Sequence, residues 1–199
     1  MPETICLFNQ KGGSGKSTST ILLALGIAEM TKHKVGILDR DPQQTATRLH
    51  AKLREDEPDI RIDIVAEGQD YSPYDTVFVD VAGYKHDPMA QRTVSEVDKV
   101  LIVTTPSPTD LDVTQEAVEF VRAKIRPHTK IALLFVRVRS NTLQARAIDD
   151  ISDYLGVRRL NSTVRDALRY QDLKVHGKKV ITVRDLNEIT RILLELHEI

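Results

Sequence analysis

The chain has 199 residues, a formal net charge of −1 and 41% hydrophobic residues, a composition typical of one globular domain of about 100–200 residues. The near-zero net charge excludes a chain that is basic overall, and the single cysteine, Cys6, excludes an intrachain disulfide. No signal peptide or membrane-spanning run is seen in the sequence, so we expect a cytoplasmic protein.

Short apolar runs alternate with segments of helical periodicity along almost the whole chain. The predicted strands are Thr4–Phe8, Val35–Leu38, Arg61–Val65, Thr76–Val79, Lys99–Val103 and Lys130–Val136. The predicted helices are Lys16–Thr31, Thr45–Arg54, Leu111–Ile125, Leu143–Leu155, Val164–Gln171 and Val183–His197. Apolar strands separated by helices indicate βαβ units around a buried parallel sheet. The predicted fold class is therefore α/β, a three-layer, doubly wound, mostly parallel sheet forming a single domain over residues 1–199.

A glycine-rich loop joins the first predicted strand to the first predicted helix. Its residues are Lys11, Gly12, Gly13, Ser14, Gly15, Lys16, Ser17 and Thr18. Glycines allow backbone N–H groups to turn onto a phosphate chain, and the helix start adds its positive end. Lys16 would supply a charge for the β- and γ-phosphates, and the Ser17 hydroxyl could bind Mg²⁺. The sequence therefore predicts a P-loop, with Gln10 where the ordinary motif has glycine and Lys11 as a second lysine.

Two other predicted strands end in carboxylates. Asp80 follows an apolar strand in the manner of a Walker B aspartate, an oxygen ligand for Mg²⁺. Asp39 and Asp41 follow another strand, and Gly83 could allow a switch loop to approach a γ-phosphate. Because ligands of such sheets bind outside the carboxyl ends of the strands, we expect a metal–nucleotide site there.

The loop from Lys11 to Ser17 resembles the deviant Walker A box of the ParA/MinD-type ATPases, a group of P-loop NTPases. The segment Asp39-Arg40-Asp41-Pro42-Gln43 is similar to the D-x-D-P-Q box of the same family. The resemblance implies that Lys11 reaches across a nucleotide-sandwich homodimer to the partner's ATP. It also implies that Asp41 orients or activates the attacking water and that Asp39 supports the Mg²⁺ shell.

Two later segments carry weaker resemblances. Residues 105–110 resemble the family's P-x-x-P-x-D segment near the nucleotide and the dimer interface, which implies an ATP contact at Pro108. Residues 136–142 resemble its N-R-V-x-x-x-T stretch beside adenine, although Val136 replaces the common asparagine. Arg137 could stack on the base, pair across the dimer, or be an ordinary surface arginine.

The C-terminal third of the chain is rich in basic residues. ParA proteins use such residues to bind DNA without sequence preference, and a solvated surface is the alternative. The predicted DNA contacts are Arg158, Arg159, Arg165, Arg169, Lys174, Lys178 and Lys179.

The last predicted helix is amphipathic, which leaves membrane binding or core packing as its role. Membrane-surface helices carry Lys and Arg on the polar face, whereas this one has more Glu and Asp, so we expect core packing.

The leading hypothesis is an ATP- and Mg²⁺-dependent dimerising ATPase for plasmid or chromosome partition, closest to short plasmid-type ParA proteins. Its expected partners are nucleoid DNA and a small centromere-binding or cargo adaptor protein, with no membrane. The alternatives are ParA-like positioning of a protein assembly or organelle and, from another class, a metabolic P-loop ligase.

Overall fold

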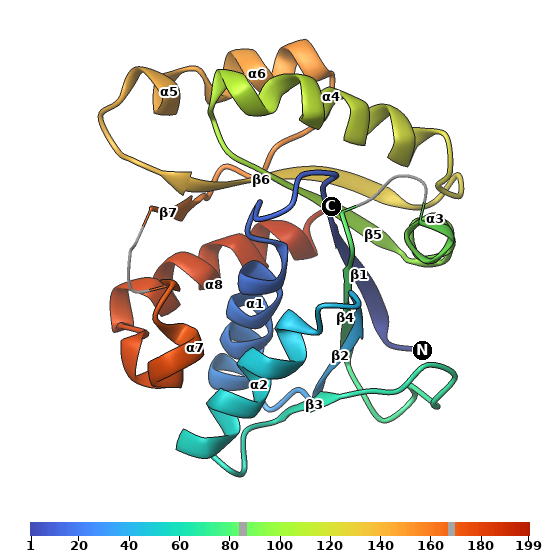
Figure 1. Ribbon diagram of the computed structural model, residues 1–199, viewed down its shortest axis with the longest axis vertical. Coiled ribbons are helices and arrows are strands. Elements are labelled where there is room, and N and C mark those ends of the chain that lie inside the picture. The colour runs from blue at the N-terminus through green and yellow to red at the C-terminus, as the bar shows by residue number, and fades with distance from the viewer. Residues whose placement is uncertain (84–86, 167–169) are drawn as a thin grey trace.

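A parallel sheet forms the centre of the protein in this computed structural model, which describes residues 1–83, 87–166 and 170–199 (Figure 1). In the described residues the sheet has seven strands in the order β3-β2-β4-β1-β5-β6-β7, and every neighbouring pair is parallel. The strands are β1 (Glu3–Phe8), β2 (Val35–Arg40), β3 (Ile62–Ile64), β4 (Thr76–Val81), β5 (Lys99–Thr104), β6 (Lys130–Val138) and β7 (Val164–Arg165). The predicted α/β class is confirmed.

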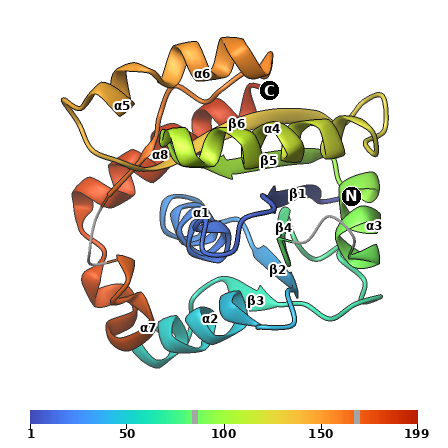
Figure 2. The same cartoon turned by 45° about the horizontal axis from the view of Figure 1, so that its top comes forward.

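Helices cover both faces of this sheet, as Figure 2 shows. The elements of the first face are α1 (Lys16–Met30), α2 (Thr45–Asp56), α7 (Leu173–His176), the 3-10 turn η2 (Gly177–Val180) and α8 (Val183–His197). The elements of the second face are α3 (Pro88–Glu96), α4 (Pro108–Arg122), α5 (Leu143–Arg146) and α6 (Ile148–Leu155). These three layers are the expected doubly wound arrangement.

Strand β1 shows how the chain divides its side chains between the two cores. Ile5 and Leu7 lie in the core beneath α1 and α8, whereas Cys6 and Phe8 lie in the core beneath α3 and α4. The period of two residues sends successive side chains to opposite faces, so a strand buried on both sides must be apolar throughout. Phe8 also stacks on Phe120, with ring centroids 5.2 Å apart.

The C-terminal helix packs into the core, as expected. Ile189, Ile192 and Leu196 are buried against α1, and Lys99 donates a hydrogen bond of 2.6 Å to the backbone carbonyl of Leu196. Gly26 of α1 allows this approach, because a Cβ there would lie 2.4 Å from Cγ2 of Ile189. Among the described residues, no helix combines the length and apolarity that spanning a bilayer requires.

Two predicted helices differ from the structure, and not every observed helix was predicted. The helix predicted over Val164–Gln171 is wrong at its start, where Val164 and Arg165 form the edge strand β7 beside β6; residues 167–169 lie outside the description. The helix predicted over Leu143–Leu155 breaks at Ala147 into α5 and α6. Helix α3 was not predicted, although Asp87 caps it and Pro88 begins it, a combination typical of a helix start.

Candidate nucleotide site

The P-loop lies between β1 and α1 at the carboxyl edge of the sheet. Gly13 and Gly15 have φ angles of 72° and 97°, the left-handed region that glycine adopts without steric cost. Gly15 is the N-cap of α1, so the first N–H groups of a 15-residue helix open onto the loop. A cleft of about 310 Å³ lies here; its lining residues are Gly12, Gly13, Ser14, Gly15, Lys16, Ser17, Thr18, Asp41, Gln43, Thr45, Gly83 and Arg137. This arrangement can bind a phosphate chain.

Lys16 lies at the base of this cleft and is 7% exposed. Burial lowers the pKa of its ammonium group, and the nearby carboxylates of Asp80 and Asp41 oppose that shift. Its Nζ donates a hydrogen bond of 3.3 Å to the backbone carbonyl of Lys11. A Cβ on Gly83 would lie 2.8 Å from this Nζ, so the chain after β4 approaches the lysine as closely as glycine permits.

Asp80 is the one fully buried carboxylate of the site. It is the second-last residue of β4, beside Asp39 of β2 in the parallel register, and neither of its carboxylate oxygens has a hydrogen-bond partner among the described residues. Burial raises the pKa of Asp80 to about 7, and the charge of Asp39 adds to the shift. The nearby Ser17 hydroxyl, which lies outside hydrogen-bond geometry, and the charge of Lys16 oppose it. A buried acceptor without a partner beside a hydroxyl fits a Mg²⁺ ion or its water ligands.

The other two predicted carboxylates are held by local hydrogen bonds. Asp39 Oδ2 accepts hydrogen bonds of 2.8 Å from both the backbone N–H and the hydroxyl of Thr47, which fixes the start of α2. Asp41 Oδ1 accepts the N–H of Gln43 at 2.8 Å, and Asp41 lines the cleft. Asp41 thus lines the cleft with one carboxylate oxygen bonded to its own loop, whereas Asp39 is bonded to Thr47 of α2.

Arg137 lies at a bulge at the end of β6. The register between β6 and β7 shifts between Val136 and Val138, and Arg137 takes a left-handed φ of 54°, which is uncommon for a non-glycine residue. The bulge directs its guanidinium over the P-loop, where it donates a hydrogen bond of 2.7 Å to the carbonyl of Gly13. A smaller cavity of about 100 Å³ lies beside it, between the start of α1 and β7.

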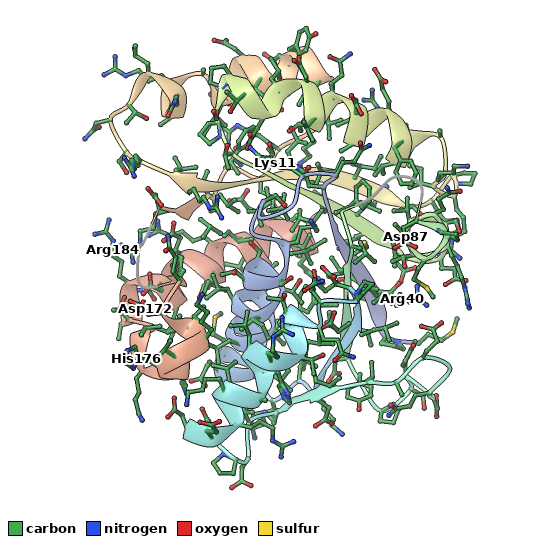
Figure 3. All side chains as sticks on the ribbon, viewed as in Figure 1. Lys11, Arg40, Asp87, Asp172, His176 and Arg184 are labelled. Carbon is green, nitrogen blue, oxygen red and sulfur yellow. The ribbon has the colours of Figure 1, made fainter. Side chains whose placement is uncertain are left out.

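Lys11 is absent from the lining of the phosphate cleft. Its side chain turns toward α4, where Nζ lies 2.5 Å from Oδ1 of Asp110 (Figure 3). It lines a second cleft of about 300 Å³, together with Thr105, Ser107 and Arg139. Pro108 is exposed as the first residue of α4 and lines neither cleft, so its predicted ATP contact stays a prediction.

Most of the predicted DNA-contacting residues form ion pairs within the chain. Lys178 pairs with Glu29 and Glu57, Lys179 with Asp56, Arg159 with Asp149, and Arg165 with Asp185. Within the part of the chain that the structure describes, Arg158 and Lys174 are exposed and form no such pair. Arg169 lies outside the described residues.

Two residues that support the site carried no predicted role. Asn9 is buried directly before the loop; its amide donates to the carbonyl of Val103 at 2.7 Å and its Oδ1 accepts the N–H of Lys11 at 2.8 Å. Arg40 binds Glu67 through two hydrogen bonds and donates to Thr93 of α3 at 2.7 Å, which connects the strand end beside Asp41 to that helix. A polar residue that ends an apolar strand was the available signal for Asn9.

The fold and the site define a P-loop nucleotide-binding protein with carboxylates at neighbouring strand ends. The chain belongs to the CobQ/CobB/MinD/ParA nucleotide binding domain family, whose model matches residues 5–183. The predicted membership of the ParA/MinD group is confirmed.

Similar proteins are known in sequence and in structure. The chain is 26% identical over 209 residues to maintenance of carboxysome distribution protein A of Halothiobacillus neapolitanus, covering 97% of this chain and 95% of that protein. It is similar to the MinD cell division protein of Aquifex aeolicus (TM-score 0.76, 18% identity, 96% and 97% of the two chains). It is also similar to pNOB8 ParA bound to nonspecific DNA (TM-score 0.69, 15% identity, 100% and 99%). The two structural likenesses establish the fold.

The raised pKa of Asp80 predicts a pH-dependent stability. Because the folded chain holds the Asp80 proton up to about pH 7 and the unfolded chain loses it near 3.8, the stability contributed by this proton falls as pH rises between these values. We expect Asp80→Asn to be more stable than the unmodified chain in the absence of nucleotide, with an advantage that grows by on the order of 2 kcal/mol from pH 5 to pH 8.

Urea denaturation at both pH values measures this advantage, and Asp59→Asn, at an exposed aspartate, is the control. An Asp80→Asn variant that is less stable than the unmodified chain by the same amount at both pH values would contradict a raised pKa of Asp80.

Proposed function

We propose that this protein is an ATP-dependent dimerising ATPase switch that binds DNA in its ATP-bound form and positions a cargo. The supporting observation is the separation of the two lysines of the loop. Lys16 lies in the phosphate cleft, whereas Lys11 points out of it and lines a neighbouring cleft. A lysine that does not reach the phosphates of its own subunit is suited to reach those of a second subunit placed against this face.

The residues of the cleft divide the work of phosphoryl transfer. Lys16, the loop N–H groups and the start of α1 bind the β- and γ-phosphates, and Asp41 positions the attacking water. Ser17 and Asp80 would hold Mg²⁺, which neutralises phosphate charge when bound; Asp39, bound to Thr47, orients the strand end. Lys11 from the partner subunit completes the charge around the γ-phosphate, so turnover depends on dimerisation.

Lys11→Ala tests whether Lys11 acts in the partner's site and not in its own. We expect the variant to retain nucleotide binding, because Lys16 and the cleft are intact, and to lose at least about tenfold in ATP turnover measured with nonspecific DNA present. Binding is followed with a fluorescent ATP analogue and turnover by phosphate release.

Lys32→Ala, at an exposed lysine beyond the far end of α1, is the matched control. Unchanged turnover in Lys11→Ala would rule out the role of Lys11 in the partner's site.

The proteins that are similar in sequence help to choose between the proposed cargoes. The full-length relative at 26% identity maintains the distribution of carboxysomes, a protein assembly. This favours positioning of a protein assembly over partition of a plasmid or chromosome. The proposed partner is then a small adaptor protein on that assembly, and the proposed location is the nucleoid in the cytoplasm. An adaptor that binds a specific DNA site instead would restore the partition hypothesis.

For DNA, the structure favours a different set of basic residues from those predicted. Arg184 and Arg191 are exposed on α8 and form no ion pair within the described residues, and Figure 3 shows Arg184 at the margin of the molecule. They line a polar groove of about 640 Å³, opposite Ser140, Asn161 and Ser162. Arginines without a carboxylate partner, beside hydroxyl and amide donors, suit DNA phosphates.

Glu188 also lines this groove, but it accepts the N–H of Arg165 at 2.9 Å, and its side chain is turned to that residue. Lys178 and Lys179, in contrast, would have to give up their ion pairs to bind a phosphate. Arg158 and Lys174 remain candidates for contacting DNA, because they are also exposed.

The double variant Arg184→Ala/Arg191→Ala is expected to weaken gel retardation of nonspecific duplex DNA in the presence of ATP. The slope of log affinity against log salt concentration should fall in magnitude by about 2 per subunit, because two phosphate contacts are lost. ADP should abolish retardation in every variant.

Lys178→Ala/Lys179→Ala is the matched control, since it removes the same charge from ion-paired positions. A larger loss of DNA affinity in this control than in the arginine variant would assign the DNA contact to η2 instead.

A further inference from the structure

The ion pair between Lys11 and Asp110 joins two parts of the chain that are 99 residues apart. Lys11 belongs to the P-loop, and Asp110 is the third residue of α4. Their charged atoms are 2.5 Å apart, and the Lys11 side chain is 46% exposed whereas that of Asp110 is only 7% exposed. The half-exposed ammonium group of Lys11 is thus paired with a carboxylate that is almost fully buried.

Asp110 is fixed in this position from several sides. Its Oδ2 accepts the hydroxyl of Thr105 at 2.7 Å, its N–H donates to the carbonyl of Ser107 at 2.9 Å, and its carbonyl accepts the hydroxyl of Thr114 at 2.6 Å. Burial opposes its charge, but the hydrogen bonds from Lys11 and Thr105 outweigh burial and hold the pKa of Asp110 below its usual value. The carboxylate is therefore ionised and cannot move with the lysine.

The backbone of Lys11 is also fixed, because its N–H donates to Asn9, whose amide is bound to β5. Only the lysine side chain can leave the pair. A γ-phosphate from a second subunit would bring further negative charge to Nζ. A phosphate that binds Nζ while Nζ stays on Asp110 would lie close to this carboxylate. The two negative charges would repel each other strongly, because little water screens Asp110.

We propose that Asp110 is a latch, which holds Lys11 on its own subunit and must release it before the ATP-bound dimer can form. The inference rests on the proposed function, in which Lys11 binds the partner's ATP. Asp110 is here a positioning residue: it acts through Lys11 and touches no nucleotide.

Symmetry strengthens the effect of the latch. In a two-fold dimer both lysines must be released, so the fraction of unlatched subunits enters the dimerisation constant twice. A latch that leaves about one third of the subunits free would weaken dimerisation by about ninefold. The free subunit would thereby resist pairing until ATP supplies the competing phosphate.

Asp110→Asn tests the latch, since asparagine keeps the size of the side chain and an acceptor for Thr105 but removes the charge. We expect the protein concentration at which half the chain is dimeric with Mg²⁺ and AMPPNP to fall by about three- to tenfold. Sedimentation velocity measures this concentration. Asp112→Asn, at an exposed aspartate two residues on in α4, removes the same charge and should leave it unchanged.

Acylation of Lys11 in the nucleotide-free chain provides a second readout, followed by mass spectrometry with a succinimidyl ester. The latch predicts several-fold faster acylation of Lys11 in Asp110→Asn, with Lys32 unchanged as an internal reference. A role of Asp110 in fold stability alone would not single out Lys11.

Weaker dimerisation in Asp110→Asn, or equal behaviour of Asp110→Asn and Asp112→Asn, would overturn the latch. These results differ from failure of the proposed function itself, in which the unmodified chain stays monomeric with AMPPNP at every concentration tested.

Discussion

The site is arranged around the buried carboxylate of Asp80, which has no hydrogen-bond partner in the part of the chain that the structure describes. Strands β2 and β4 place this carboxylate next to Asp39, and burial together with the charge of Asp39 raises the pKa of Asp80 to about 7. Lys16 is buried beside it and has its own pKa lowered. Among the described residues, the Asp80 carboxylate has no hydrogen-bond partner and Lys16 donates to a backbone carbonyl at 3.3 Å, so the arrangement favours a ligand that brings both phosphate and a cation.

The surrounding structure holds this costly arrangement in place. Asn9 fixes the loop to β5, Asp39 fixes the start of α2, and Arg40 ties the same strand end to α3. Gly83 lets the chain beyond β4 lie against Lys16. The P-loop, α2 and α3 are thus each bonded to a strand end beside the cleft, a connection that the proposed switch would require.

The sequence predicted best those parts of the site that are formed by residues close together in the chain. The P-loop and the strand-end carboxylates are recognisable because glycine geometry and the alternation of strand and helix are set by neighbouring residues. The contacts that decide the role of the charges could not be predicted, because they join distant segments: Lys11 with Asp110, and Lys178 with Glu29, 149 residues away. Strand β7 was missed because two residues at a sheet edge give too short a pattern, and its pairing with β6 is tertiary.

The central claim is that Lys11 of one subunit acts on the ATP of the other, and mixing two inactive variants tests it most directly. Lys11→Ala keeps Asp41 but cannot supply the lysine, whereas Asp41→Ala keeps the lysine but cannot position the water. Mixed dimers contain one complete site, formed by Asp41 of the first variant and Lys11 of the second. The account predicts that the mixture recovers ATP turnover that neither variant shows alone; a mixture as inactive as its components, although mixed dimers form, would contradict it.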